Sequence, residues 1–234
     1  MKRLSSPDGS FVLERPSQLF PLTRNLSYPL THLIYRLPIT PNQVTALSML
    51  AGLAGAWCFA LGGWQNQIAG GFWLVACYTL DNCDGEIARL KALYSEWGAQ
   101  FDDFVDWLVD SAFFAALGYG TWQTTGETLW AWLGAAAALG ATIDYAVDLI
   151  LHARAKASPT GQSREDQASG ERKPEDVADW LIYIFHKLSR ADFCLIVLAL
   201  AAFDVLWVLL PLGAIGAQAY WITDLFKRAR GWHT

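Results

Sequence analysis

Long apolar runs separated by short polar connections make up most of the chain after residue 40. Each run is about 20 residues long, which is the length that an α-helix needs to cross the hydrocarbon core of a bilayer. Only Asp204 and Pro211 separate the last two runs. The pattern therefore predicts an all-α fold, a polytopic membrane bundle of six transmembrane helices. The predicted spans are 43–62, 67–87, 98–119, 128–151, 191–207 and 208–226.

Two other stretches carry apolar residues at every third or fourth position, as amphipathic helices do. The first runs from Leu19 to Leu37, where Pro21 and Pro29 are expected to break the helix into short pieces. The second is 177–188, ahead of the fifth span. Both patterns indicate helices that lie in the membrane interface with their leucines buried. A packed helix beside the membrane explains the first stretch equally well and predicts the same burial.

These elements divide the chain into two parts. Residues 1–40 form a cytoplasmic N-terminal segment with the first amphipathic helix, and its first 18 residues are polar and expected to be loosely ordered. Residues 41–234 form the six-helix membrane domain. Within it, the hydrophilic stretch 156–173 is expected to be a flexible cytoplasmic loop.

The positive charges predict the orientation in the membrane. All 17 Lys and Arg residues lie at the termini or in connections expected on one side. The connections near 63–66, 120–127 and 204–211 contain none, so the positive-inside rule places both termini and the acidic motif described below in the cytoplasm. We expect a multi-pass integral membrane protein of a bacterial inner (plasma) membrane. The formal net charge of -5 does not suggest nucleic acid binding.

Four carboxylates lie at the junction of the second and third predicted spans. Asp81 and Asp84 are three positions apart, and Asp102 and Asp106 are four apart, so each pair projects from one face of its helix. If the two helices are antiparallel neighbours joined near 92–98, the carboxylates converge into one cluster. Such carboxylates repel one another, whereas a hard divalent cation turns the repulsion into attraction. We therefore expect Mg²⁺ or Mn²⁺, and the cluster is about as wide as a pair of ions.

The fixed positions of this stretch resemble the signature of the CDP-alcohol phosphotransferase (CDP-alcohol phosphatidyltransferase) family. They are Asp81, Asp84, Gly85, Ala88, Arg89, Gly98, Asp102 and Asp106. The resemblance implies a six-helix membrane enzyme, often a homodimer, that moves the phosphoalcohol part of a CDP-alcohol onto an acceptor hydroxyl and releases CMP in phospholipid biosynthesis. It suggests CDP-diacylglycerol as the donor and a small polar alcohol as the acceptor.

The same resemblance implies roles for individual residues. The metal ligands would be Asp81, Asp84, Asp102 and Asp106, with Asp106 also the catalytic general base. The CDP-binding residues would be Asn42, Thr45, Gly85, Ala88, Arg89 and Gly98. Simpler explanations also exist, because the glycines could be helix punctuation, Asn42 and Thr45 could be part of a helix cap, and Arg89 could form an ion pair with Glu86.

The acceptor site is less constrained. Asp144 and Asp148 lie four apart in the cytoplasmic half of the fourth span, and Lys187 and Arg190 lie where the fifth span begins. Intramembrane carboxylates usually face a bundle interior or a wet cavity, so we take these four as candidate acceptor-binding residues. An ion pair with a neighbouring helix explains the two aspartates equally well.

Other functions remain open at this point. A soluble CDP-inositol or CDP-choline type of donor is compatible with the same family signature. The segment Asp102-Asp103-Phe104-Val105-Asp106 also matches the DDxxD box of membrane prenyltransferases. A divalent-cation carrier would account for intramembrane acids but not for the fixed positions of Gly85, Arg89 and Gly98.

Overall fold

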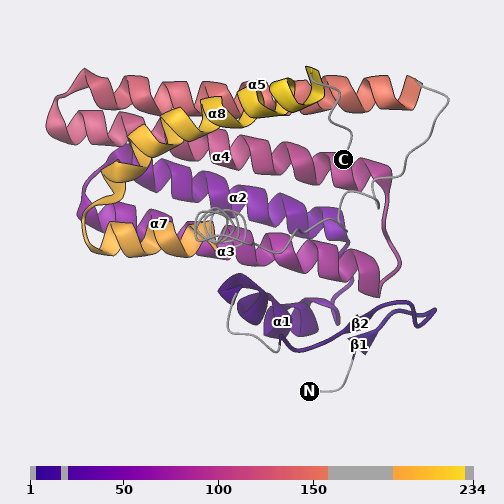
Figure 1. The fold of residues 1–234 in the computed structure, drawn as a ribbon. Coiled ribbons are helices and arrows are strands. Elements are labelled where there is room, and N and C mark those ends of the chain that lie inside the picture. The colour runs from indigo at the N-terminus through magenta and orange to yellow at the C-terminus, as the bar shows by residue number, and fades with distance from the viewer. Residues whose placement is uncertain (1–3, 17–20, 158–191, 230–234) are drawn as a thin grey trace, which may run out of the picture.

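The structure is a computed structural model that describes residues 4–16, 21–157 and 192–229. Helices form most of it (Figure 1). The long helices are α2 (Pro41–Leu61), α3 (Trp64–Leu90), α4 (Glu96–Thr125), α5 (Thr128–Ala157) and α8 (Leu209–Ala229). Shorter elements are α1 (Leu22–Ile34), α7 (Phe193–Ala202), the 3-10 helix η2 (Leu206–Val208), and a hairpin of β1 (Leu4–Ser5) and β2 (Val12–Leu13).

Helices α2 to α5 coincide with the first four predicted spans. In Figure 1 they lie side by side, with α7 against α3 and α8 against α5. The fifth span, predicted as 191–207, is shorter than expected. Helix α7 ends at Ala202, because the chain turns at 203–205, where Asp204 has a φ of 59°. Its ten residues extend over about 15 Å.

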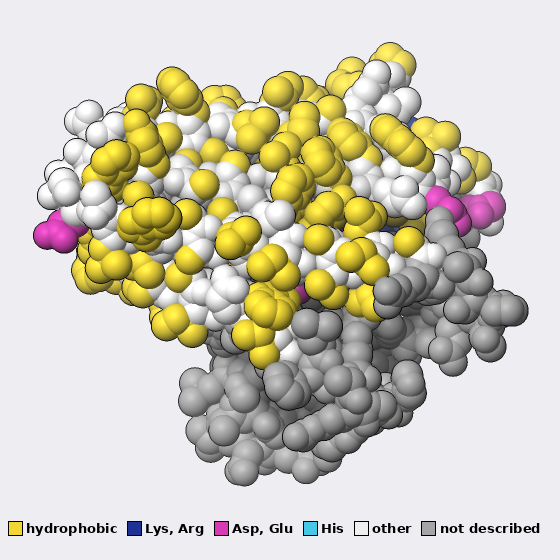
Figure 2. Space-filling view, turned by 90° about the horizontal axis from the view of Figure 1, so that it is seen from above, with side chains coloured by type: hydrophobic (Ala, Val, Ile, Leu, Met, Phe, Trp, Pro, Cys, Tyr) yellow, Lys and Arg dark blue, Asp and Glu magenta, His cyan; other side chains and the backbone are white. Residues whose placement is uncertain are grey.

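The described helices differ in whether they are long and apolar enough to cross a membrane. By length and apolar composition alone, two of the described helices could cross a membrane, over Pro41–Leu61 and Thr128–Ala153. Figure 2 shows hydrophobic side chains spread over the face above α5 and α8. The mostly exposed apolar side chains of these two helices include Trp132 and Leu139 of α5 and Ile215 of α8. An apolar surface of this kind is typical of contact with lipid or with another protein.

Small residues allow the helices to pack closely. A Cβ atom on Gly118 would lie 2.7 Å from the carbonyl oxygen of Trp130 and 2.8 Å from the Cα atom of Gly134, so α4 and α5 touch backbone to backbone there. Between α2, α3 and α4 the core is built from larger side chains such as Phe59 and Phe113, whose rings meet edge to face. The bundle therefore holds α3 and α4 in a fixed relation.

Helix α1 differs from the prediction in one way, because it is continuous through Pro29. Its buried side chains include Thr23, Ser27 and Thr31, whereas Leu26 and Leu33 are 45% and 62% exposed. The helix therefore packs against the bundle with its hydroxyl face, and Leu26 and Leu33 point away from the protein, as the interfacial interpretation expects.

Two buried carboxylates explain why the polar face of α1 is the inner one. Glu86 of α3 accepts hydrogen bonds from Ser27 Oγ at 3.0 Å and from Thr31 Oγ1 at 2.5 Å. Asp192, just before α7, accepts from the backbone N–H groups of Leu22 at 3.0 Å and Thr23 at 3.1 Å. A carboxylate at this position satisfies the free N–H groups at the start of a helix and interacts favourably with the helix dipole.

The N-terminal segment also departs from the prediction. Residues 4–13 form the β1–β2 hairpin, where a loosely ordered segment was expected. In its turn the Asp8 carboxylate accepts hydrogen bonds from Ser6 and Ser10, which lowers the pKa of Asp8 to about 2. The predicted loop 156–173 lies almost wholly outside the described residues, and the second amphipathic helix, 177–188, lies entirely outside them.

Candidate metal and nucleotide site

The two helices that carry the acidic motif are joined by a short turn, as predicted, but each packs against α2 more than against the other. Helix α3 ends at Leu90 and α4 begins at Glu96, so the two are joined by 91–95. Lys91 fixes this turn, because its Nζ donates to the carbonyl oxygens of Leu37 at 2.9 Å and Ile39 at 2.8 Å. Ser95 caps α4 by accepting a hydrogen bond from the backbone N–H of Gly98.

Three of the four motif aspartates come together in the structure. One carboxylate oxygen from each of Asp81, Asp102 and Asp106 lies within 4.8 Å of the others, which is the spacing of a group that could hold a metal ion. Asp84 is not part of this group. It is 6% exposed and accepts a hydrogen bond of 2.6 Å from Thr45 Oγ1 at the start of α2.

The donor set fits a divalent metal ion. The Oδ1 atom of Asp102 is buried and has no hydrogen-bond partner among the described residues. A buried acceptor without a partner is costly, and three carboxylates this close repel one another. A hard cation would remove both costs, because carboxylate oxygens are the ligands that Mg²⁺ and Mn²⁺ prefer. Asp84 would join such a site only after giving up or sharing its bond to Thr45.

The two motif glycines serve different purposes. A Cβ atom on Gly98 would lie 2.9 Å from Asn42 Oδ1 and 3.0 Å from Ser95 Oγ, so this glycine allows the first turns of α2 and α4 to meet. A Cβ atom on Gly85 would meet nothing closer than Arg89, at 3.7 Å. Packing inside the described protein therefore explains Gly98 but not Gly85.

The remaining predicted nucleotide residues lie around these glycines. Asn42 and Thr45 are in the first turns of α2, which starts with a capping box formed by Thr40 and Gln43. Arg89 lies one turn after Gly85 on α3, next to the half-buried Ala88. Its guanidinium is 5.0 Å from the centre of the Phe11 ring, which makes a cation–π contact with the β1–β2 hairpin. The predicted alternative partner, Glu86, is bonded instead to the hydroxyl groups of α1.

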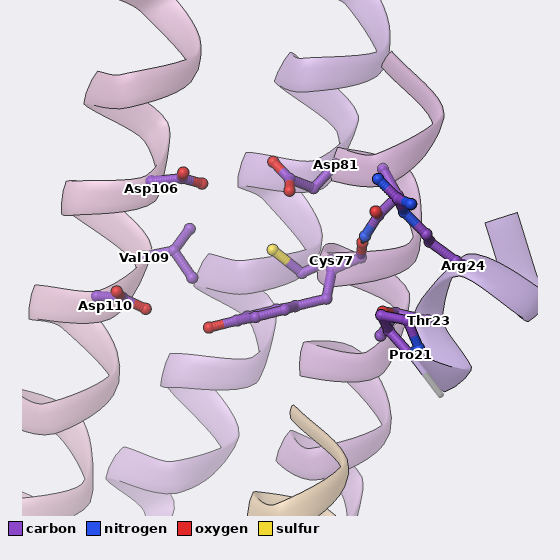
Figure 3. Close-up of a pocket in the computed structure, with 10 residues that line it drawn as sticks. Pro21, Thr23, Arg24, Cys77, Asp81, Asp106, Val109 and Asp110 are labelled. Atoms are coloured by element: carbon purple, nitrogen blue, oxygen red, sulfur yellow. The ribbon is translucent and has the colours of Figure 1, made fainter. Parts of the chain in front are cut away.

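A cavity of about 500 Å³ opens beside the aspartates (Figure 3). Three helices contribute its walls. The lining residues are Pro21, Thr23 and Arg24 of the α1 region, Cys77, Tyr78, Asp81 and Asn82 of α3, and Asp106, Val109 and Asp110 of α4. Asp110 continues the spacing of Asp102 and Asp106 but was not among the predicted site residues. Nothing in the sequence pointed to Arg24, which is 57 positions away from Asp81.

Two of the predicted acceptor residues, Asp144 and Asp148, are not among the described residues that line this cavity. Asp144 and Asp148 lie on α5, where they are half-buried and exposed respectively. Nearby, α5 is joined to α4 by Trp107, whose ring stacks on Tyr145. Lys187 and Arg190 lie outside the described residues.

Comparison with known proteins identifies the family. A model of the CDP-alcohol phosphatidyltransferase family matches residues 38–217, and the protein belongs to that family. Its members are transferases that act on CDP-linked alcohols. The match includes α2 to α5, α7 and the first part of α8, and therefore both helices that carry the motif aspartates.

Individual relatives are more distant. The chain is 30% identical over 122 residues to a protein of Thermococcus kodakarensis named bifunctional IPC transferase and DIPP synthase, covering 52% of this chain and 26% of that protein. It is 31% identical over 111 residues to the phosphatidylinositol phosphate synthase of Cutibacterium acnes, covering 47% and 52%. The matched stretches thus span about half or less of these relatives.

A solved structure shows the same fold. The phosphatidylinositol phosphate synthase of Mycobacterium tuberculosis, crystallised with CDP-DAG bound, superposes with a TM-score of 0.52 at 22% identity, over 84% of this chain and 91% of that one. At this level of identity the likeness shows the arrangement of helices and no more.

Proposed function

We propose that the protein is a metal-dependent CDP-alcohol phosphotransferase that moves a phosphatidyl group from CDP-diacylglycerol to the hydroxyl of a small polar alcohol and releases CMP. The observation that carries this proposal is the close approach of Asp81, Asp102 and Asp106, together with a buried Oδ1 of Asp102 that has no hydrogen-bond partner in the described part of the chain. The motif residues Gly85 and Arg89, on the same helix, leave open backbone and a cation for a diphosphate.

The residues divide the chemistry between them. Asp81, Asp102 and Asp106, with Asp84, would hold Mg²⁺ or Mn²⁺, and bound ions would stabilise the negative charge that develops on the departing CMP. Arg89 would bind a phosphate oxygen of the donor, and Asn42, Thr45, Gly85, Ala88 and Gly98 would surround the cytidine and diphosphate. The acceptor oxygen would attack the phosphorus that carries the alcohol, the bond from that phosphorus to the CMP oxygen would break, and Asp106 would accept the hydroxyl proton.

The membrane arrangement belongs to the same proposal. Residues 41–234 would form a six-helix domain of a multi-pass protein in a bacterial inner membrane, with both termini and the site on the cytoplasmic side, and two copies would pair as a homodimer. Residues 1–40 would lie at the surface of the membrane. The outward leucines Leu26 and Leu33 and the apolar face of α5 and α8 support this arrangement.

The choice of donor rests on the relatives. The Mycobacterium tuberculosis neighbour is described with CDP-DAG bound, which favours CDP-diacylglycerol. The Thermococcus kodakarensis relative is named an IPC transferase and DIPP synthase rather than a phosphatidylinositol phosphate synthase. A soluble CDP-inositol or CDP-choline type of donor should therefore be tested beside CDP-diacylglycerol.

The test is CMP release by the purified protein in detergent. We expect release with Mg²⁺, a CDP-linked donor and an alcohol acceptor, and none after EDTA treatment until Mg²⁺ is restored. Asp106→Asn should abolish turnover while leaving some donor binding. Asp204→Asn is a matched control, because Asp204 lies in the α7–η2 turn and asparagine tolerates its positive φ.

Other outcomes would refute the proposal. Pyrophosphate release from an isoprenyl diphosphate, without CMP release, would identify a prenyltransferase. Metal flux into liposomes without CMP release would identify a carrier. Unchanged turnover in Asp106→Asn would remove the proposed general base.

A further inference from the structure

The β1–β2 hairpin lies near the C-terminal end of α3 (Figure 1). Leu13 of β2 is 5% exposed and anchors the hairpin to the protein. Phe11, two positions earlier, has its ring centre 5.0 Å from the Arg89 guanidinium. The match to the family model begins at residue 38, so the hairpin lies outside the matched region. A segment outside that region thus touches a residue of the family motif.

The turn of the hairpin fixes the backbone of Phe11. The Phe11 N–H donates to Ser6 Oγ at 2.9 Å, and the Phe11 carbonyl oxygen accepts from the Ser6 N–H at 2.8 Å. The Ser6 hydroxyl in turn donates to the Asp8 carboxylate at 2.6 Å. Ser6 is 4% exposed, so water competes little for these bonds. The Phe11 ring is therefore carried on a hydrogen-bonded turn rather than on a loose end of the chain.

The Arg89 guanidinium lies back over Gly85, one turn earlier on α3. Its two Nη atoms and its Cζ atom are 3.7, 3.8 and 4.0 Å from the place that a Cβ atom on Gly85 would occupy. A long side chain such as arginine has many rotamers, and only some of them bring the guanidinium to this place. The contact with Phe11 favours those rotamers over the others. The ring and the glycine together thus define where the positive charge lies.

The contact with Phe11 leaves the N–H groups of Arg89 available. Arg89 is exposed and makes no hydrogen bond or ion pair among the described residues. By contrast, the ammonium of Lys91 donates to the carbonyl oxygens of Leu37 and Ile39 and is used to fix the chain. An aromatic ring attracts a guanidinium through its face, whereas phosphate oxygens bind the N–H groups at the edge. One guanidinium can therefore serve a ring and a phosphate at the same time.

We propose that Phe11 is a positioning residue for the donor. Its ring would hold the Arg89 guanidinium over Gly85, where the N–H groups would bind the diphosphate of the CDP-linked donor. This inference rests on the proposed transferase function and on the role which that function gives to Arg89. Without the ring, Arg89 would keep its charge but sample more rotamers, and ordering the side chain would then cost binding free energy. The hairpin would thus raise the affinity for the donor without touching it.

The test measures binding of CDP to the full-length protein in detergent with Mg²⁺, because CDP carries the diphosphate of the donor without its lipid. Phe11→Leu keeps an apolar side chain but removes the ring, and should weaken CDP binding about two- to fivefold, the range of an exposed cation–π contact. Phe11→Tyr keeps a ring face and should bind CDP as tightly as the wild type. In the CMP-release assay, Phe11→Leu should raise the donor KM by the same factor and leave kcat and the acceptor KM within about twofold.

A double-mutant cycle separates an effect through Arg89 from direct contact with the nucleotide. If Phe11 acts through Arg89, Phe11→Leu should change CDP binding by less than about 1.5-fold in the Arg89→Gln background. An equal loss in both backgrounds would mean that the ring meets the nucleotide itself, and would overturn the inference. Val12→Ala is the matched control, because Val12 is 40% exposed and successive side chains of an extended chain point to opposite sides. Its CDP binding should equal that of the wild type.

The remaining outcomes each decide the question. Unchanged CDP binding in Phe11→Leu would overturn the inference, and so would an equal loss in Phe11→Tyr or in Val12→Ala. If the wild type neither binds CDP nor releases CMP from any donor, the proposed function fails and the inference fails with it. If the wild type releases CMP while Phe11→Leu keeps its full affinity for CDP, only the role of Phe11 is refuted.

Discussion

The buried carboxylate of Glu86 offers a sharp test of how α1 is attached. Glu86 is 9% exposed, and its side-chain oxygens accept from Ser27 Oγ at 3.0 Å and Thr31 Oγ1 at 2.5 Å. Replacing Thr31 by valine keeps the shape but removes one hydrogen bond to a charged group. We expect a loss of about 2 kcal/mol in the free energy of unfolding. For a chain of this size that lowers the melting temperature by about 4 to 8 °C.

Removing both hydroxyl groups should be worse. In the double variant Ser27→Ala, Thr31→Val, a buried carboxylate loses both partners, which costs about 3 to 5 kcal/mol. Adding Glu86→Leu should restore most of this loss, because an apolar side chain of similar size needs no partner. The triple variant should melt well above the double variant.

The measurement is the loss of helical circular dichroism on heating, with all variants in one detergent. Thr125→Val is the control, because Thr125 is exposed and its hydroxyl bonds only to backbone groups near the end of α4, donating to the carbonyl oxygen of Thr121 and accepting from the N–H of Glu127. Its free energy of unfolding should change by less than about 0.5 kcal/mol, so its melting temperature should stay close to that of the wild type. If Thr31→Val has the same melting temperature as the control, or if the melting temperature of the triple variant is no higher than that of the double variant, Glu86 does not anchor α1 as described.

Three further predictions concern the donor side of the site. Gly85→Ala should leave the melting temperature unchanged, because its Cβ meets nothing closer than 3.7 Å, but should raise the KM for the donor in the CMP-release assay. Thr45→Val removes the hydrogen bond to the buried Asp84 and should weaken Mg²⁺ activation about 10- to 100-fold in an Mg²⁺ titration, whereas Thr45→Ser should retain it. Phe11→Leu removes the ring beside Arg89 and should raise the donor KM about two- to fivefold, corresponding to the ~0.5–1 kcal/mol of an exposed cation–π contact. An unchanged donor KM in the first and third variants, or unchanged Mg²⁺ dependence in the second, would refute the respective role.

Short-range features were readable from the sequence. The spacing within each acidic pair and the small gap between the pairs are enough to build a helical hairpin. They therefore predicted that Asp81, Asp84, Asp102 and Asp106 would converge, and in the structure three of them do, whereas Asp84 is bonded to Thr45. The hydrophobic period located α2 to α5 for the same reason, since a helix is set by neighbours three and four positions apart.

Predictions failed where distant contacts outweigh local preference. Pro29 costs about 3 kcal/mol inside an isolated helix, so a break was the natural expectation. In the fold, the bonds of Glu86 and Asp192 to α1 offset such a cost, and the helix continues. The leucine stripe likewise did not show which face of α1 meets the protein. The buried carboxylate of Glu86 requires hydrogen-bond partners, and nothing in the sequence of α1 indicates that Glu86 will lie beside it.

The sequence by itself determined the family and placed the four motif aspartates on two consecutive helices joined by a short turn, because these features depend on residues close together along the chain. Only the tertiary structure decided that Asp84 is bonded to Thr45, that Gly98 is a packing position while Gly85 is open, and that Arg24 shares a cavity with Asp106. Each of these depends on which helices lie side by side, and helix periodicity carries no information about that.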